Sequence, residues 1–229
     1  ERLNIIHTAF LRQDKLSIYN LKEFTEINNN ITQIIFDLLN KNKQSRIVSF
    51  SSGAAKYYDK KNDIKSNPYG YLKKEEEKII EKNANEYLIM RVYGLTGKYI
   101  QEYNTFALGN FINQAYKGER ITINSKRSTL RSYVNASDIS KLSIKWLNDT
   151  KNHRREKVNA ITETISLLGL ASLISAKYNL PEVSHNIDIK LEEDNYTENK
   201  DSFLSLLKSY NINPKTLEEQ IFDTYKSFK

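Results

Sequence analysis

Apolar segments alternate with amphipathic segments through the first 92 residues, and this alternation constrains the fold more than any other feature of the sequence. The segments 4–10, 47–50 and 87–92 are short, apolar and rich in β-branched residues, as buried strands are. The segments 24–40 and 69–85 between them have helical character, which is clearest in the apolar stripe of the first. In the second, Glu75-Glu76-Glu77 and the flanking lysines predict an exposed face. The order strand–helix–strand–helix–strand predicts an α/β protein with a parallel sheet covered by helices.

The second half of the sequence is less regular and contains no internal repeat and no long linker. It predicts short strands at 121–123, 130–135, 157–161 and 187–191. It also predicts helices at 106–117, 137–147, 167–178, 201–209 and 216–226. Ser137 is the expected N-cap of the second of these helices, because serine favours that position.

The predicted strand at 47–50 is followed by residues that could transfer a proton. The apolar segment Ile47–Phe50 runs into Ser51-Ser52-Gly53, and Tyr69 and Lys73 stand four residues apart at the start of the next helix. That spacing places the phenol and the ammonium on one helix face. A free phenol has a pKa of about 10, and an adjacent ammonium lowers it. The pattern predicts proton transfer by Tyr69, assisted by Lys73, with a serine hydroxyl that holds the substrate oxygen.

The spacing alone is not specific, since this chain is rich in tyrosine and lysine. Three other pairs match it, namely Tyr57/Lys61, Tyr196/Lys200 and Tyr225/Lys229. Only Tyr69 follows a strand that ends in Ser-Ser-Gly-Ala and also opens a helix. This context selects Tyr69. For the serine, the pattern favours Ser52, and Ser51 stays open as the alternative.

Composition narrows the class of protein. The net charge of +7 comes from 35 basic and 28 acidic residues mixed along the chain, which favours solvated faces over a nucleic-acid footprint. No segment approaches the roughly 18 apolar residues of a membrane span, and no secretory leader is visible. The absence of cysteine excludes disulfides and thiolate metal sites, and no histidine has metal-ligand spacing. A cytoplasmic protein without membrane segment or metal is expected.

The stretch Ser51-Ser52-Gly53-Ala54, followed by Pro68-Tyr69 and Lys73, resembles the extended short-chain dehydrogenase/reductases. It is most similar to the NAD-dependent epimerase/dehydratase group, which acts on nucleotide sugars. Further segments resemble that group in the same order, and they are His7-Thr8-Ala9, Asn28–Thr32, Arg91–Gly97, Leu108–Ile112, Lys117–Ile123, Leu130–Ile139, Val158–Leu168 and Asn213–Ile221.

The resemblance implies a Rossmann-like parallel sheet with helices on both faces, truncated at its N-terminus, and a small C-terminal substrate-binding lobe. The implied partial dinucleotide-binding domain is 1–93 with returning strands near 131–161. The implied nucleotide-sugar lobe is 94–130 and 162–229.

The resemblance also implies the roles of residues. The catalytic residues would be Tyr69, Lys73 and Ser52. NAD or NADP would contact Thr8, Ala9, Asn28, Ser51, Tyr69 and Lys73. A nucleotide-sugar substrate would contact Asn110 and Arg131, where an arginine fork matches the geometry of a phosphate. Members of this family often form homodimers, so a homodimer is expected.

One part of the family pattern is missing. The family opens with a Gly-x-x-Gly-x-x-Gly turn that cradles the cofactor pyrophosphate, and the seven glycines here form no such turn. The expectation is a nucleotide-sugar epimerase or 4-keto-reductase, since Ser-Gly-Ala replaces the Thr-Asp-Glu of the dehydratases. A non-catalytic remnant or binding module of the same fold is the main alternative, and an RNA-binding member of the fold is a third.

Overall fold

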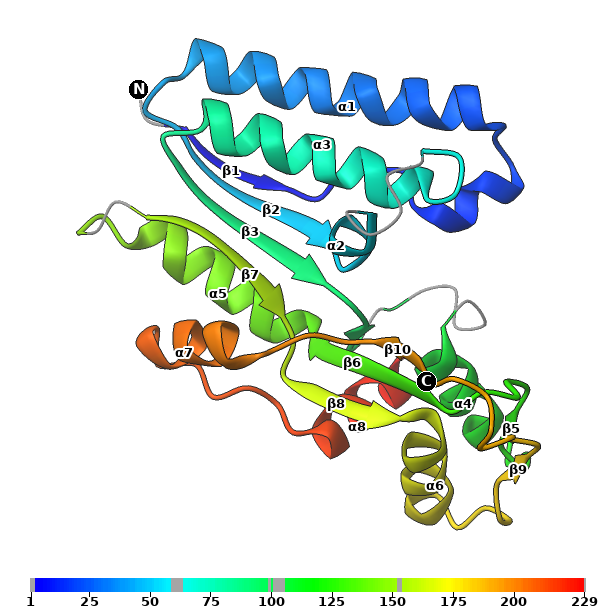
Figure 1. Cartoon of the computed structure of the whole chain (residues 1–229). Coiled ribbons are helices and arrows are strands. Elements are labelled where there is room, and N and C mark those ends of the chain that lie inside the picture. The colour runs from blue at the N-terminus through cyan, green and yellow to red at the C-terminus, as the bar shows by residue number, and fades with distance from the viewer. Residues whose placement is uncertain (1–2, 59–63, 99, 101–105, 152–153, 229) are drawn as a thin grey trace. The chain divides into compact units, whose positions relative to one another are not determined.

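The computed structural model describes residues 3–58, 64–98, 100, 106–151 and 154–228 (Figure 1). The chain divides into two compact units, and each is described here by itself. The first comprises Glu1–Val92 and Lys141–Asn159, and the second comprises Tyr93–Ser140 and Ala160–Lys229.

The first unit is built on a four-stranded sheet of order β1-β2-β3-β7. Its strands are β1 (Asn4–His7), β2 (Arg46–Ser52), β3 (Glu86–Val92) and β7 (Arg155–Ala160). Strand β1 pairs in parallel with β2, and β2 pairs in parallel with β3 in an unbroken register. Six of the seven residues of β2 are buried, as expected for a strand covered on both faces. The Rossmann-like α/β class predicted from the sequence is confirmed.

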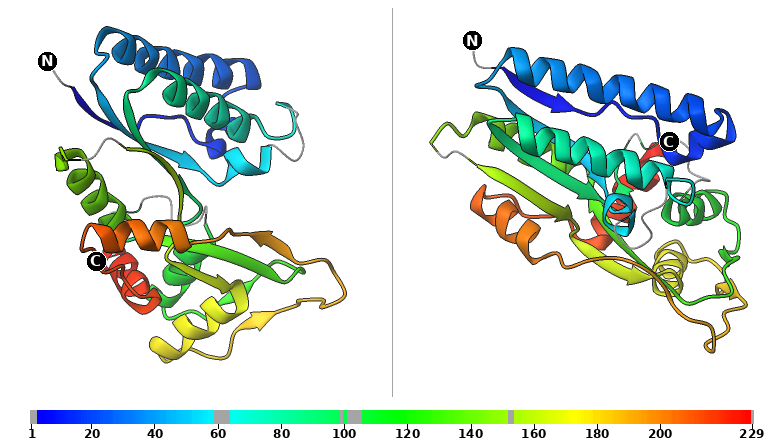
Figure 2. Two further views of the ribbon diagram at one scale, coloured as in Figure 1. Left: turned by 60° about the vertical axis from the view of Figure 1, so that its left-hand side comes forward. Right: turned by 45° about the horizontal axis from the view of Figure 1, so that its top comes forward.

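Two long helices, α1 (Leu21–Lys41) and α3 (Pro68–Asn83), lie side by side on one face of this sheet (Figures 1 and 2). A capping box formed by Asn20 and Glu23 begins α1. Its inward positions recur every three or four residues, so that one stripe of the helix is buried against α3 and the sheet. The helices hold the sheet rigidly beneath the site described below.

The other face of the first sheet carries a buried charge. Arg46, at the start of β2, has no exposed surface, and its Nε lies 2.9 Å from a carboxylate oxygen of Glu86. The guanidinium stacks 4.6 Å from the ring centroid of Trp146 and donates to the carbonyl of Leu147, both near the end of helix α5 (Ala136–Asn148). This cluster lies at the amino ends of the strands, away from the edge where the sequence predicts chemistry.

The second unit surrounds strand β6 (Thr129–Asn135). Strands β4 (Leu95–Thr96) and β10 (Asp194–Tyr196) pair with β6 in parallel, and β8 (Glu163–Ser166) pairs with it antiparallel. A separate parallel pair joins β5 (Thr122–Ile123) and β9 (Ser184–His185). The helices of this unit are α4 (Ala107–Tyr116), α6 (Leu167–Lys177), α7 (Asp201–Ser209), α8 (Leu217–Tyr225) and a closing turn, Lys226–Phe228.

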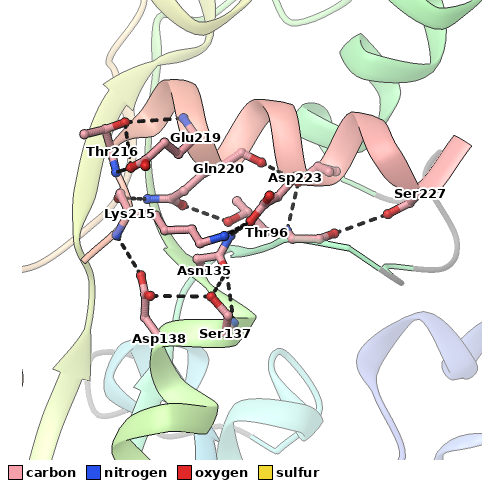
Figure 3. A network of polar contacts seen from close by, with 12 residues as sticks. Thr96, Asn135, Ser137, Asp138, Lys215, Thr216, Glu219, Gln220, Asp223 and Ser227 are labelled. Carbon is pink, nitrogen blue, oxygen red and sulfur yellow. Dashed lines mark hydrogen bonds and ion pairs between the residues drawn. The ribbon is translucent and has the colours of Figure 1, made fainter. Parts of the chain in front are cut away.

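A buried polar network fastens α8 to β4 and β6 (Figure 3). The hydroxyl of Thr96 lies 2.8 Å from Oε1 of Gln220, and the amide nitrogen of Gln220 donates to Thr162 at 3.0 Å. Where β6 ends, Asp138 has no exposed surface and accepts the backbone N–H of Lys215 at 2.9 Å. Buried polar groups that satisfy one another in this way specify a single docking position for the helix.

Two local predictions for this unit were wrong. Ser137 does not cap α5: the side chain of Asn135 does, because its Oδ1 accepts the backbone N–H of Ser137 at 2.9 Å. The expected edge strand at 187–191 is absent from the described residues, and strands form instead at 184–185 and 194–196. Ile189 is 91% exposed, so the apolar residues of that segment have no core to join.

Candidate active site

The carboxyl ends of β1 and β2 form the edge of the first sheet at which the predicted site lies. Because the strands are parallel and in register, His7 is paired with Ser49, and β2 continues three residues further to Ser52. Thr8 and Ala9 follow β1 directly and are exposed. The open end of a parallel sheet is the usual location of ligand sites in such folds.

Local sequence explains how α3 begins beside this edge. The side chain of Asn67 accepts the backbone N–H of Gly70 at 2.9 Å, and Pro68 occupies the first helical turn. A Cβ atom at Gly70 would lie 2.4 Å from the carbonyl oxygen of Ala54, in the short helix α2 (Ala54–Tyr58) that follows β2. Only glycine permits this close approach, which brings Tyr69 and Lys73 to the end of β2.

Lys73 is almost completely buried, with 3% of its surface exposed. Its Nζ donates to the carbonyl oxygen of Phe50 at 2.9 Å and to Oε1 of Glu76 at 3.2 Å. The ring of Phe10 covers the ammonium, with its centroid 3.7 Å from Nζ. Burial lowers the pKa of the Lys73 ammonium below its ordinary value, and the charge of Glu76 opposes that effect only in part.

In the sequence, Ser52 precedes the short helix α2 and Tyr69 follows it. Tyr69 is half-buried, and its ring meets the edge of the Phe10 ring at a centroid distance of 5.9 Å. Ser52 is buried at the last position of β2, where its hydroxyl accepts the backbone N–H of Ala54 at 3.2 Å. The elements that carry Tyr69, Lys73 and Ser52 therefore converge within the first unit, and Phe10 contacts both Tyr69 and Lys73.

Two glutamates of α3 were misjudged from the sequence. The triplet Glu75-Glu76-Glu77 was expected to form an exposed face of the helix, yet Glu76 and Glu77 are each only 1% exposed. Their partners are distant in sequence: Glu76 meets His7 and Ser49, and Glu77 meets Ser51 and Arg91. Only Glu75 remains at the surface, with its side chain 39% exposed and paired with Lys78.

The two remaining residues expected at the cofactor contact protein groups. Asn28 is buried in α1, and its amide accepts from and donates to the backbone of Leu11 at 2.7 and 3.2 Å, which secures the loop after β1. The hydroxyl of Ser51 donates to Glu77 at 2.6 Å. Asn28 and Ser51 thus have structural partners in this chain, whereas Thr8 and Ala9 are presented at the edge.

The predicted substrate residues lie in the second unit. Asn110 is in the first turn of α4, where its Oδ1 accepts a hydrogen bond from the side chain of Gln114. Arg131 in β6 donates to the Asp194 carboxylate at 2.6 Å and to the Asp194 carbonyl at 2.9 Å. Its guanidinium is therefore engaged by β10.

The types of side chain at the sheet edge are suited to the nicotinamide end of a dinucleotide. An ammonium has three N–H donors, and the described residues supply two acceptors to Lys73, Phe50 and Glu76, so its third donor is the one that a ribose hydroxyl would take, beside the Phe10 ring that covers the ammonium. The 229 residues contain no glycine-rich turn suited to a pyrophosphate. Within the described part of the chain, no group of three metal-ligating side chains occurs, and no helix has the length and apolarity to cross a membrane.

The fold and the site together define a Rossmann-like α/β protein with tyrosine and lysine at the carboxyl edge of a parallel sheet. Residues 4–160 match the model of the NAD dependent epimerase/dehydratase family. The chain belongs to this family, as the resemblance in its sequence predicted. No curated protein sequence matches it.

Solved structures with the same fold include several nucleotide-sugar enzymes. A UDP-N-acetylglucosamine 4-epimerase from Methanobrevibacter ruminantium, in complex with UDP-N-acetylmuramic acid, is 18% identical with a TM-score of 0.76, over 99% of this chain and 76% of that one. A Bacillus cereus UDP-glucuronic acid 4-epimerase, in complex with a substrate analogue and NAD, is 17% identical with a TM-score of 0.75, over 98% and 74%. A Thermotoga maritima UDP-glucose 4-epimerase with UDP-glucose is also 17% identical, with a TM-score of 0.71 over 98% and 76%.

Proposed function

We propose that this protein is an NAD(P)-dependent nucleotide-sugar epimerase or 4-keto-reductase. The observation that carries the proposal is the position of Tyr69 and Lys73 in the first turns of α3, beside the end of β2, in a chain of the epimerase/dehydratase family. The similar structures hold UDP-glucose, UDP-N-acetylmuramic acid or NAD, which supports this substrate class and this cofactor.

In the proposed reaction Tyr69 accepts the proton of a sugar hydroxyl while the hydride leaves the carbon that bears it. Bound NAD would supply the hydride acceptor. The positive charge of Lys73 favours the phenolate form of Tyr69, and the Ser52 hydroxyl donates to the substrate oxygen. In the reverse direction Tyr69 would give its proton back to the oxygen of the keto sugar. An epimerisation would require that the keto sugar be reduced from its opposite face.

In the second unit, Arg131 and Asn110 are the proposed contacts of the nucleotide diphosphate. Arg131 is held by Asp194, so a phosphate would have to displace that carboxylate from the guanidinium. An exposed ion pair of this kind contributes at most about 1 kcal/mol, which a phosphate that accepts two hydrogen bonds can exceed. Asp194→Asn should therefore tighten binding of a nucleotide diphosphate.

A non-catalytic binding module is the second candidate function. Lys73 already has two polar partners in the protein and an aromatic ring over its ammonium, an arrangement that would also suit a lysine with a purely structural role. This candidate predicts nucleotide-sugar binding without turnover.

The direct test incubates the protein with NAD or NADP and a panel of UDP- and dTDP-sugars, and in parallel with NADH or NADPH and the corresponding 4-keto sugars, with products resolved by NMR. An epimerase interconverts two sugars without net change in reduced cofactor. A 4-keto-reductase consumes one reduced cofactor for each keto sugar. Binding without any product would favour the module and contradict the enzyme.

A cytoplasmic location and a homodimer are also proposed. The absence of cysteine in 229 residues is consistent with a reducing compartment. On α1, Ile34 is 60% exposed, so its substitution would probe a partner surface on that helix. Light scattering of Ile34→Glu against the unaltered protein would test the dimer.

A further inference from the structure

Glu76, which takes no part in the proposed reaction, lies at the centre of a buried cluster that includes Lys73. Its Oε2 lies 3.0 Å from Nε2 of His7 in β1. Its Oε1 lies 3.2 Å from the hydroxyl of Ser49 in β2 and 3.2 Å from Nζ of Lys73 in α3. Three elements therefore direct a polar atom at one carboxylate that is 1% exposed.

The partners of Glu76 make it an anion. Burial by itself raises the pKa of a carboxyl, but the Lys73 charge and the hydrogen bond from His7 together hold the pKa of Glu76 below its ordinary value. An ionised carboxylate can only accept hydrogen bonds. Nε2 of His7 consequently carries the proton in this contact, and the Ser49 hydroxyl donates.

The other charged groups near Lys73 are committed to one another. Glu77 in α3 is held by Arg91 of β3 through both carboxylate oxygens, at 2.8 and 2.6 Å. Lys157 of β7 lies 3.7 Å from the same carboxylate. Within the described residues, Glu76 is thus the carboxylate in direct contact with Lys73, beside the carbonyl of Phe50 and the ring of Phe10, and Glu77 contributes a second, indirect negative charge.

We propose that Glu76 is a positioning residue of the site: it keeps the buried Lys73 amine charged and fixes its direction relative to Tyr69. Without the Glu76 carboxylate, the contacts of the 3% exposed ammonium within the described residues would be a carbonyl and an aromatic ring, with Glu77 as a further negative charge, and burial would favour the neutral amine. A neutral lysine could not favour the phenolate form of Tyr69. The catalytic meaning of this arrangement rests on the proposed function, whereas the Lys73–Glu76 coupling does not.

The coupling can be measured without cofactor or substrate. Lysine labelled with ¹³C at the ε position reports the titration of each amine by NMR, and Lys73→Arg identifies the signal of Lys73. Glu76→Gln keeps the size of the side chain and removes the charge. Glu75→Gln is the matched control, because Glu75 adjoins Glu76 on the same helix but is 39% exposed and paired with Lys78.

Glu76→Gln is expected to raise the acid dissociation constant of Lys73 by about tenfold or more, the effect of losing one adjacent opposite charge, while Glu75→Gln leaves it unchanged. An unchanged Lys73 titration in a folded Glu76→Gln protein would overturn the proposal. If that variant does not fold, the unaltered protein decides: a Lys73 charged at neutral pH supports the proposal, and a neutral Lys73 overturns it. Because no turnover is measured, failure of the proposed enzymatic function would leave this result intact.

Discussion

Arg91 of β3 forms a bidentate hydrogen-bonded ion pair with Glu77 of α3. Nε of Arg91 lies 2.8 Å from one carboxylate oxygen and its terminal nitrogen lies 2.6 Å from the other, with the Glu77 side chain 1% exposed. The same carboxylate accepts the hydroxyl of Ser51 at the end of β2. This pair therefore holds the helix that carries Tyr69 and Lys73 against β2 and β3.

Replacing Arg91 by lysine should destabilise the protein although the charge is kept. Lysine cannot reproduce the planar fork, so one of the two hydrogen bonds from Arg91 to the buried carboxylate is lost, at a cost of about 1–3 kcal/mol in the free energy of unfolding. Arg12→Lys is the matched control, because Arg12 also forms a bidentate pair with a carboxylate, that of Asp14, but its side chain is 44% exposed. Urea unfolding should show a much smaller loss for the control. Equal losses would contradict the assigned role of burial.

Replacing Gly70 by alanine should also destabilise the fold, and through a different cause. The added methyl would lie 2.3 Å from the side chain of Asn67 and 2.4 Å from the carbonyl of Ala54. Helix α3 would have to move away from α2, at a cost of about 1–3 kcal/mol. Lys82→Ala, at an exposed position of the same helix, should change the free energy of unfolding by less than about 0.5 kcal/mol. A Gly70→Ala protein as stable as this control would refute the close approach.

Tyr178 should make stability fall at alkaline pH. Burial, with a smaller effect from Tyr225, raises the pKa of its phenol from 10.0 to about 12, and its hydroxyl is buried with no hydrogen-bond partner among the described residues. Below pH 10.0, the ordinary pKa of the phenol, the folded and the unfolded protein both hold the Tyr178 proton. As the pH rises from there toward about 12, the unfolded chain loses this proton first, so the free energy of unfolding falls over this pH range.

The check is urea unfolding at about pH 8 and at about pH 11, with Tyr178→Phe beside the unaltered protein. The phenylalanine variant should lose less stability between the two pH values, and at the lower pH it should be at least as stable as the unaltered protein, because it removes an unsatisfied buried hydroxyl. Tyr116→Phe is the control, since Tyr116 is 46% exposed. The same alkaline loss in all three proteins would contradict the account.

Local patterns were enough to predict the sheet and its order of elements. The strands around Ile47 and Leu88 are short and β-branched, and the stripe of α1 has helical spacing, so each segment signals its own structure. The end of β2 at Ser52 and the start of the helix that carries Tyr69 could be recognised for the same reason. Their roles in chemistry stay predictions.

Long-range partners explain what the sequence did not predict. Glu76 and Glu77 look like surface residues because lysines flank them, and nothing local indicates that His7 and Arg91 will meet them inside the protein. Asn135, and not Ser137, caps α5 because β6 ends at Asn135 and the helix begins at the next residue, two positions before the expected cap. Arg131 was expected to contact a phosphate of the substrate. Its ion pair with Asp194 depends on the pairing of β6 with β10, two strands whose contacting residues are 63 positions apart in the sequence.

The central claim is that Tyr69 transfers the proton in a reaction on a nucleotide sugar. The most direct measurement compares turnover of Tyr69→Phe with that of Tyr71→Phe, a second tyrosine of the same helix, at saturating cofactor and sugar. Loss of the acid–base group should reduce turnover by about 10²–10⁴-fold in Tyr69→Phe with unchanged cofactor affinity, while Tyr71→Phe keeps the original rate. Equal turnover in the two variants would contradict the claim.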